Sequence, residues 1–235
     1  MEDVEIDICI EQILNAQMTV LRGFTAMERR KMYDIGPYTI EDNQKREDRT
    51  ELIDGYIYKM KSYLPIYGIY LRNLYGMIMK ACNEGEEYGR PFMFVGVRLD
   101  KDDKTVIVPD ICVVKDEEQV AGGEFVEGAP KVTIEFLGSD LEDRKRDLYL
   151  KLLKYKEAGV REYWIIDVEH KNLMVYDFQE ITLPKFYSFN DEVPAENIMT
   201  GLKLDFKELE EKVKKFYEAA EFARKVKEKK TAGSK

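Results

Sequence analysis

One stretch, residues 105–167, constrains the fold most, because it places single acids in the middle of apolar strands. It begins with TVIVPDICVV, which carries Asp110, and continues with KVTIEFL, which carries Glu135. A charged helix, DRKRDLYLKLLKYKEAG, and a last apolar strand, EYWIID, complete it. An acid within a buried strand requires a partner, since burying an unpaired carboxylate is costly. The order strand, strand, helix, strand predicts a sheet with a helix packed on it.

The two strand acids are placed to meet in space. Because alternate residues of a strand share a face, Asp110 is expected on the face of Cys112, and Glu135 on the face of Leu137. Carboxylates from adjacent strands can offer oxygen ligands to Mg²⁺. Pro109 cannot donate a ladder hydrogen bond, so it predicts a bend that aims the neighbouring acid.

The helix expected over residues 143–159 adds charge on one face. Asp147, Lys151 and Tyr155 follow one another at four-residue intervals and therefore share that face. A lysine near a metal-bound water can position it or stabilise charge on a phosphate. Residues 142–161 contain seven Lys or Arg against four acids, although the whole chain has a net charge of −9. The overall charge argues against a general nucleic-acid coat, and the local charge allows a basic site.

Each of these residues also has an ordinary structural interpretation. Asp147 and Lys151 fit an exposed ion pair on a helix. Glu135 fits a surface acid on an edge strand, and Asp110 after Pro109 fits a turn. Their joint order, acid, acid and then lysine on the following helix, favours a functional site.

The remaining elements follow periodicity and turn signals. The Asp54-Gly55 pair predicts a β-hairpin over ELIDGYIYKM. The order predicts a mixed α/β fold, a central mixed sheet flanked by helices, with an N-terminal hairpin and extra terminal helices. The other expected segments are a helix over 66–83, a strand over 92–99 that pairs with TVIVPDICVV, an acidic glycine-rich loop over 115–130, a strand NLMVYDF after EYWIID, an irregular stretch over 190–206 and a helix over 206–230.

Three regions are expected along the chain. Residues 1–36 form a helical extension for packing or oligomerisation, residues 37–206 form the main domain, and residues 207–235 form a C-terminal helix with a basic tail. The acidic start MEDVEID does not resemble a secretory signal, and no apolar run approaches the ~20 residues that span a bilayer. The three cysteines form no CxxC pair, which indicates free thiols. A soluble, cytoplasmic protein is expected.

At these motifs the chain resembles the Uma-type "putative restriction endonuclease" family, a bacterial group within the PD-(D/E)XK nuclease superfamily. The resemblance covers roughly residues 37–206 and implies a restriction-endonuclease-like core. Its most specific part is AGVREYWIID together with the preceding Asp147, Lys151 and Tyr155. The other matching segments are YTIED, ELIDGYIYKM, FVGVRLD, VPDICVVKD, EGAPKVTIEFL and GLKLDFKEL.

The resemblance implies a set of roles. Asp110 of the Pro-Asp motif and Glu135 of the second motif are the metal ligands. In this family the lysine does not usually follow the second acid by two residues, where this chain has Leu137, so Lys151 takes its place as the third catalytic residue. The implied reaction is hydrolysis of DNA phosphodiester bonds by a water activated by Mg²⁺, with Mn²⁺ as a substitute. Glu51, in the Glu-Leu-Ile-Asp-Gly segment, is expected to reach the site.

Asp147 and Tyr155 are expected to lie around these residues. The chain departs from the family twice: Gly138-Ser139-Asp140-Leu141 stands where Ser-Pro-Ser-Thr is common, and Tyr67 or a neighbour stands in place of a helix histidine. The only histidine, His170, is expected in a surface turn.

Two alternatives to the nuclease stay open. These departures suit a catalytically inactive nuclease-fold module that binds a protein or a nucleic acid. A two-carboxylate glycosidase leaves Lys151 unexplained and has only Trp164, in a core-like strand, for sugar stacking. A homodimer is expected for the nuclease, because cutting both strands often uses two active sites.

Overall fold

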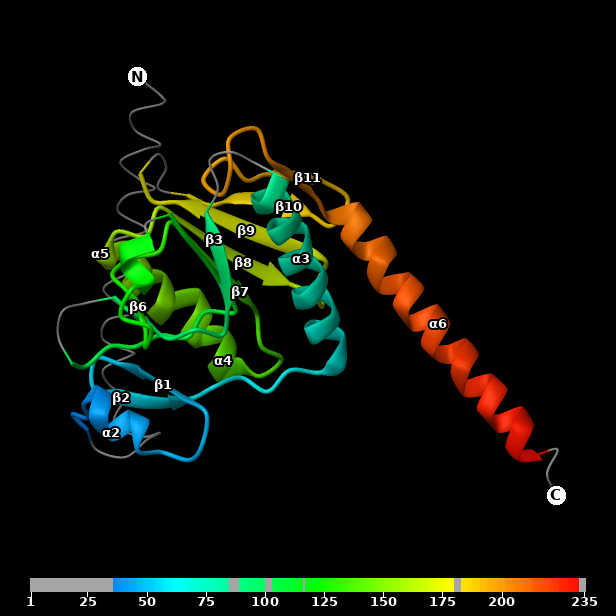
Figure 1. Cartoon of the computed structure of the whole chain (residues 1–235), viewed down its shortest axis with the longest axis horizontal. Helices are drawn as coiled ribbons and strands as arrows, with labels where there is room; N and C mark the ends of the chain where they lie inside the picture. The colour runs from blue at the N-terminus through cyan, green and yellow to red at the C-terminus, as the bar shows by residue number, and fades with distance from the viewer. Residues whose placement is uncertain (1–35, 85–88, 100–102, 116, 180–182, 233–235) are drawn as a thin grey trace.

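A six-stranded mixed sheet forms the centre of the protein in the computed structural model, which describes residues 36–84, 89–99, 103–115, 117–179 and 183–232 (Figure 1). The strand order is β10-β9-β8-β7-β5-β3, and β7 and β8 are parallel while the other neighbours are antiparallel. The predicted central mixed sheet is therefore confirmed. The strands are β3 (Arg90–Met93), β5 (Ile111–Val114), β7 (Val132–Phe136), β8 (Glu162–Asp167), β9 (Asn172–Asp177) and β10 (Lys185–Ser188).

Strands β7 and β8 are buried along their whole length, because other elements cover both faces of the sheet. Ile134 and Phe136 pack into the core on one face. Glu135, between them, points to the opposite face, where Leu137 joins a second core. The alternation expected from the sequence thus decides which core each residue of β7 enters.

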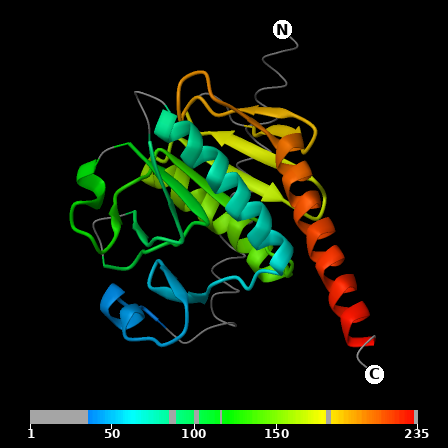
Figure 2. The same cartoon turned by 45° about the vertical axis from the view of Figure 1, so that its right-hand side comes forward.

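The first face is covered by α3 (Pro65–Glu84) and by the start of α6 (Phe206–Ala232). Figures 1 and 2 show α3 lying across the sheet while α6 continues away from the body towards the C-terminus. Trp164 and Phe206 are fully buried in this core. A small sheet of β11 (Glu192–Pro194) and β12 (Lys203–Asp205) precedes α6. Lys171 Nζ donates to Glu210 Oε1 at 2.8 Å and ties α6 to the turn after β8.

The opposite face carries the helical crossover between β7 and β8 and the N-terminal hairpin. The crossover consists of α4 (Leu141–Lys145), a π-helical turn η2 (Arg146–Lys151) and α5 (Leu152–Ala158). Gly159, at φ 87°, ends it in the left-handed conformation that favours glycine. The hairpin is β1 (Thr50–Ile53) and β2 (Tyr56–Lys59), preceded by the short helix α2 (Ile40–Gln44).

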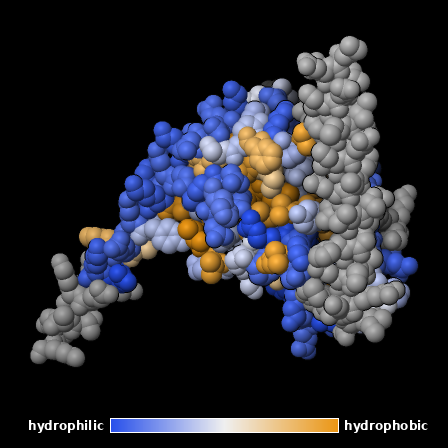
Figure 3. All heavy atoms as spheres, turned by 180° about the vertical axis from the view of Figure 1, so that it is seen from behind, coloured by the Kyte–Doolittle hydropathy of each residue, from blue (hydrophilic) through white to orange (hydrophobic). Residues whose placement is uncertain are grey.

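Hydrophobic residues are unevenly spread over the outside. On the face seen from behind in Figure 3, apolar residues gather in the middle of the body, and hydrophilic residues cover its outer part. On α6 the predicted apolar stripe is buried only at its start, since Leu209 and Val213 are buried while Phe216 is exposed. Residues 216–225 of this helix are exposed and therefore take no part in the core.

Five expectations differ from the structure. The strand expected over 92–99 is interrupted at Phe94, whose φ of 53° lies in the left-handed region, and it resumes as β4 (Val97–Arg98). TVIVPDICVV forms a regular strand only from Ile111, because Val106 and Ile107 bridge to Leu52 and Val97 instead.

In the other three segments the structure has elements that the sequence did not predict. Residues 190–206 contain β11 and β12, whose three-residue strands are too short to give a clear alternation. The helix over 143–159 contains the π turn. The expected loop over 115–130 also holds a 3₁₀ turn, η1 (Glu117–Val120), and β6 (Val126–Glu127), which pairs with β4.

The structure tests the expectations about the chain ends and the cysteine thiols only in part. The expected N-terminal helix and Cys9 lie outside the described residues. Cys82 and Cys112 are free and buried. No helix among the described residues is long and apolar enough to cross a membrane. The three expected domain boundaries stay predictions.

Truncation of Ile134 on the central strand is expected to destabilise the fold strongly. Ile134→Ala removes a fully buried side chain and leaves a cavity, which should lower the free energy of unfolding by about 2–5 kcal/mol. Urea denaturation followed by the fluorescence of Trp164, the single tryptophan, measures this change. Phe186→Ala on β10, where the side chain is 71% exposed, is the control and should stay within about 0.5 kcal/mol of the wild type. Equal denaturation midpoints for the two variants would contradict this account of the core.

Candidate active site

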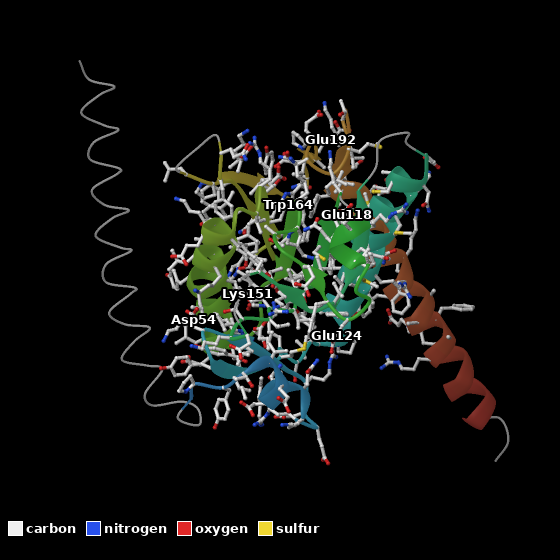
Figure 4. All side chains as sticks on the ribbon, turned by 60° about the vertical axis from the view of Figure 1, so that its left-hand side comes forward. Asp54, Glu118, Glu124, Lys151, Trp164 and Glu192 are labelled. Atoms are coloured by element: carbon white, nitrogen blue, oxygen red, sulfur yellow. The ribbon has the colours of Figure 1, made fainter. Side chains whose placement is uncertain are left out.

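Seven charged side chains meet in the interior, between the sheet, the helical crossover and the segment after the hairpin. Figure 4 shows Lys151 in the middle of the body, above the hairpin that carries Asp54. All six residues expected at the site from the sequence are buried here, including Tyr155. The charged members are Glu51, Lys61, Asp110, Glu135, Arg146, Asp147 and Lys151.

Glu135 lies at the centre of this cluster. Its Oε1 accepts hydrogen bonds from Lys151 Nζ at 2.7 Å and from the Tyr155 hydroxyl at 3.2 Å. Its Oε2 accepts from Lys61 Nζ at 2.7 Å. Burial disfavours the charged form, but the two ammonium groups outweigh burial and lower the pKa of Glu135. The interpretation of Glu135 as a surface acid on an edge strand is therefore wrong.

Asp110 lies at the bend expected after Pro109, directly before β5. Its Oδ2 accepts the backbone N–H of Phe136 at 2.7 Å, and the Tyr63 hydroxyl lies 2.5 and 2.6 Å from its two oxygens. Burial raises the pKa of Asp110. Asp110 is thus fixed against the end of β7, beside Glu135, as the alternation of the two strands predicts.

The helical crossover brings its charged residues inward through the π turn. Such turns insert an extra residue into a helix and occur frequently at functional sites. Asp147 and Lys151 are buried, so the interpretation as an exposed helix pair is wrong. Burial raises the pKa of Asp147. The same turn buries Arg146, whose Nε lies 2.9 Å from Glu51 Oε1.

Glu51 joins the hairpin to this group. Its Oε2 lies 3.0 Å from Lys151 Nζ and accepts the backbone N–H of Val108 at 3.2 Å. Because Glu51 pairs with both Arg146 and Lys151, it positions these two cations relative to the hairpin. The geometry thus places Glu51 within the charged cluster, and its part in a functional site stays a prediction.

Lys61 is the central residue that the sequence did not reveal. Its Nζ donates to Glu135 at 2.7 Å, to Asp147 Oδ2 at 2.9 Å and to the Phe136 carbonyl at 3.0 Å, and it lies 3.4 Å from Asp110 Oδ2. Burial disfavours its charge, but the three carboxylates raise the pKa of Lys61. Residue 61 belongs to a segment outside helix and strand, so no periodicity marks it. Tyr63, in the same segment, was missed for the same reason.

One oxygen of this cluster has no hydrogen bond. Asp147 Oδ1 is fully buried and, within the described part of the chain, accepts no hydrogen bond; Lys151 Nζ lies 3.8 Å away. Buried polar atoms are nearly always paired, so such an atom commonly marks a place for a water or an ion. Among the described residues, no group of three or more His, Cys, Asp or Glu is arranged to hold a metal ion as it stands. The Lys61 ammonium lies where the oxygens of three carboxylates converge.

A narrow cleft connects the cluster with the outside. Its volume is about 30 Å³, which suits one or two waters and not a nucleotide. Arg49 stacks over the ring of Phe94, 5.5 Å from its centroid, at this opening. Lys61, Asp110 and Lys151 line the inner part. The path from the outside to the acids therefore passes an arginine and an aromatic ring.

The link from β7 to the crossover has a clear structural role. Asp140 caps α4, since its Oδ1 accepts the backbone N–H groups of Glu142 at 3.0 Å and Asp143 at 2.9 Å. A Cβ on Gly138 would lie 2.6 Å from Asp143 Cβ, so only glycine fits there without a shift. The residues that depart from the family's Ser-Pro-Ser-Thr pattern thus start the helix that carries Asp147 and Lys151.

Tyr67 and His170, which the sequence analysis also considered, lie outside the charged cluster. Tyr67 is buried on α3, with its ring stacked on Tyr63 at 6.0 Å between centroids. His170 is exposed in the turn after β8, where its ring lies 2.9 Å from Asp167. His170 therefore has a surface role, as expected.

The fold and the buried carboxylate–lysine cluster define a nuclease-like α/β protein. A crystal structure from Anabaena variabilis ATCC 29413, described as a "putative nuclease belonging to DUF820", is similar with a TM-score of 0.60. The alignment has 20% sequence identity and covers 75% of this chain and 99% of that one, so it shows a shared fold. The Uma2 family, described as "Putative restriction endonuclease", matches residues 37–207. The chain belongs to this family. No curated protein matches it.

Removal of the α4 cap is expected to destabilise the crossover in a pH-dependent way. Asp140→Ala should lower the free energy of unfolding by about 0.5–2 kcal/mol at neutral pH. Hydrogen bonds from the backbone of Asp143 lower the pKa of Asp140 in the folded state. The stabilisation is therefore fully present above its unfolded pKa and is lost as the pH falls through the lowered one.

Denaturation at a series of pH values measures this difference. Asp140→Asn keeps an oxygen for the cap and serves as the control, so it should stay close to the wild type at neutral pH. A loss in Asp140→Ala that is as large at strongly acidic pH as at neutral pH would contradict the capping role.

Proposed function

We propose that this protein is a metal-dependent endonuclease that hydrolyses phosphodiester bonds in DNA. Family membership supports a nuclease. The observation that carries the proposal is the convergence of three carboxylates and a main-chain carbonyl on one cation, the Lys61 ammonium, at the inner end of the cleft. A position that holds a cation, at the inner end of a cleft that Arg49 lines, suits the negative charge of a phosphodiester.

The donor atoms fit Mg²⁺, with Mn²⁺ as a substitute. Asp110 and Glu135 would hold the metal, and the Phe136 carbonyl and Asp147 Oδ2 lie beside them. Hard divalent cations prefer such oxygen ligands and keep several waters. When bound, the metal would supply Lewis acidity and an activated water for attack on phosphorus.

Lys151 has a separate role in this proposal. Its ammonium is held by Glu51 and Glu135 and lines the cleft, so its position is fixed before any substrate arrives. There it can orient the attacking water and stabilise the charge that develops on the phosphate. Glu51 and Tyr155 are positioning residues, because Glu51 contacts Lys151 and Tyr155 contacts Glu135.

A second candidate function rests on one specific observation. The Lys61 ammonium already compensates the carboxylates that would bind the metal. A protein in which this lysine never leaves would be an inactive nuclease-fold module that binds a protein or nucleic acid. Metal binding separates the two functions, since only the nuclease requires it.

Substitution of the three catalytic residues is expected to abolish DNA cleavage. Asp110→Asn, Glu135→Gln and Lys151→Met each remove a charge that binds the metal or stabilises the phosphate, so nicking of plasmid DNA with Mg²⁺ or Mn²⁺ should fall by at least about a hundredfold. Gel electrophoresis of the nicked and linear forms measures the rate.

The matched control is Glu157→Gln, which removes an exposed acid from α5, outside the cleft. It should cleave at the wild-type rate. Thermal unfolding of each variant shows whether it folds, because loss of one partner of a buried ion pair destabilises by about 3–5 kcal/mol. Cleavage that persists in folded Asp110→Asn and Glu135→Gln would refute the proposal.

A further inference from the structure

The position of Lys61 raises a question that the nuclease function leaves open. Its Nζ lies 2.7 to 3.4 Å from oxygens of Glu135, Asp147, Asp110 and the Phe136 carbonyl. A divalent cation bound to these oxygens would lie about 2.0–2.1 Å from them for Mg²⁺, and so within the volume that the ammonium fills. The ammonium and the metal cannot occupy this position together.

The charges of the cluster favour a divalent ion over the ammonium. Among the described residues, the carboxylates of Glu51, Asp110, Glu135 and Asp147 face the cations Lys61, Arg146 and Lys151. Four acids thus face three bases in a buried space. A divalent ion in place of the Lys61 ammonium, bound to the same oxygens that include Asp147 Oδ2, would add the missing positive charge.

The chain around Lys61 allows the side chain to leave. Residues 60–64 belong to neither helix nor strand, and Ser62 and Leu64, which follow Lys61, are exposed. The nearby backbone hydrogen bond from Met60 N to Arg49 O involves no atom of the lysine side chain. Lys61 also lines the cleft, so its side chain has a path towards solvent. Its withdrawal breaks no strand pairing.

We propose that Lys61 is a built-in competitor for the metal: its ammonium occupies the metal position in the metal-free protein and moves into the cleft when a divalent cation binds. The inference rests on the proposed metal-dependent function. It assigns Lys61 the control of metal affinity, since the metal has to displace a bound cation. After displacement, the ammonium would join Arg49 at the opening, where a substrate phosphate enters.

Mn²⁺ binding to the full chain tests the competition. Calorimetry compares the wild type with Lys61→Met, which keeps a long apolar side chain and removes the charge. Lys59→Met is the matched control, because Lys59 is exposed at the end of β2, two residues away. Lys61→Met is expected to bind Mn²⁺ at least about tenfold more tightly than the wild type, and Lys59→Met should bind as the wild type does.

The outcomes separate this inference from the proposed function. Binding by Lys61→Met that is equal to or weaker than wild-type binding overturns the competitor role and leaves the metal-dependent function standing. Lack of Mn²⁺ binding by both proteins overturns the two proposals together. Mn²⁺ binding by Lys61→Met but not by the wild type would support the competitor role, because it would mean that the Lys61 ammonium prevents metal binding altogether.

A second measurement uses the unaltered chain and covers the case in which Lys61→Met does not fold. Acetylation of lysine amines, read by mass spectrometry, reports whether each ammonium is accessible. Lys61 should react slowly without metal and several-fold faster with Mn²⁺, while Lys59 should react equally in both conditions. In Asp110→Asn, Mn²⁺ should no longer change the reactivity of Lys61. Unchanged Lys61 reactivity in wild-type protein to which Mn²⁺ is bound would overturn the inference.

Discussion

The pairing of Glu135 with two lysines is the interaction on which the rest of the structure depends. A carboxylate on the central strand of a sheet is tolerated only when its charge is compensated. Lys151 reaches it from the helical crossover, and Lys61 reaches it from the segment after the hairpin. The two contacts fix the crossover and the hairpin against the same face of the sheet. Compensation of the charge of one buried acid therefore holds together the sheet, the helical crossover and the segment after the hairpin.

The sequence predicts the parts of this site that follow a regular period. Alternation along two strands places Asp110 and Glu135 together, and helical spacing places Lys151 near them. Lys61 could not be predicted, because it comes from an irregular segment and its partner Glu135 lies 74 residues away. The same limit applies to the fold: the long strands and helices are marked by periodicity, whereas the short strands β11 and β12 are not. The π turn also escaped prediction, since it alters the helical period only locally.

The site also shows how departures from a family pattern can be compensated locally. Gly138 and Asp140 replace part of a common motif, and here they provide a close approach and a helix cap. The resemblance puts Tyr67 or a neighbour at the place of a common histidine, and Tyr67 stacks on Tyr63, which in turn donates a hydrogen bond to Asp110. These residues support the acids through packing and hydrogen bonds.

Because the Lys61 ammonium lies among the acids, the protein can fold before any metal binds. In many small metalloproteins the ligands repel one another until the ion arrives, and the ion then contributes a large part of the folding free energy. In this protein the acids meet lysines and an arginine of the same chain. A newly made chain can therefore complete its core in a chelating environment, and under the proposed metal dependence a shortage of metal would remove the activity and leave the fold intact.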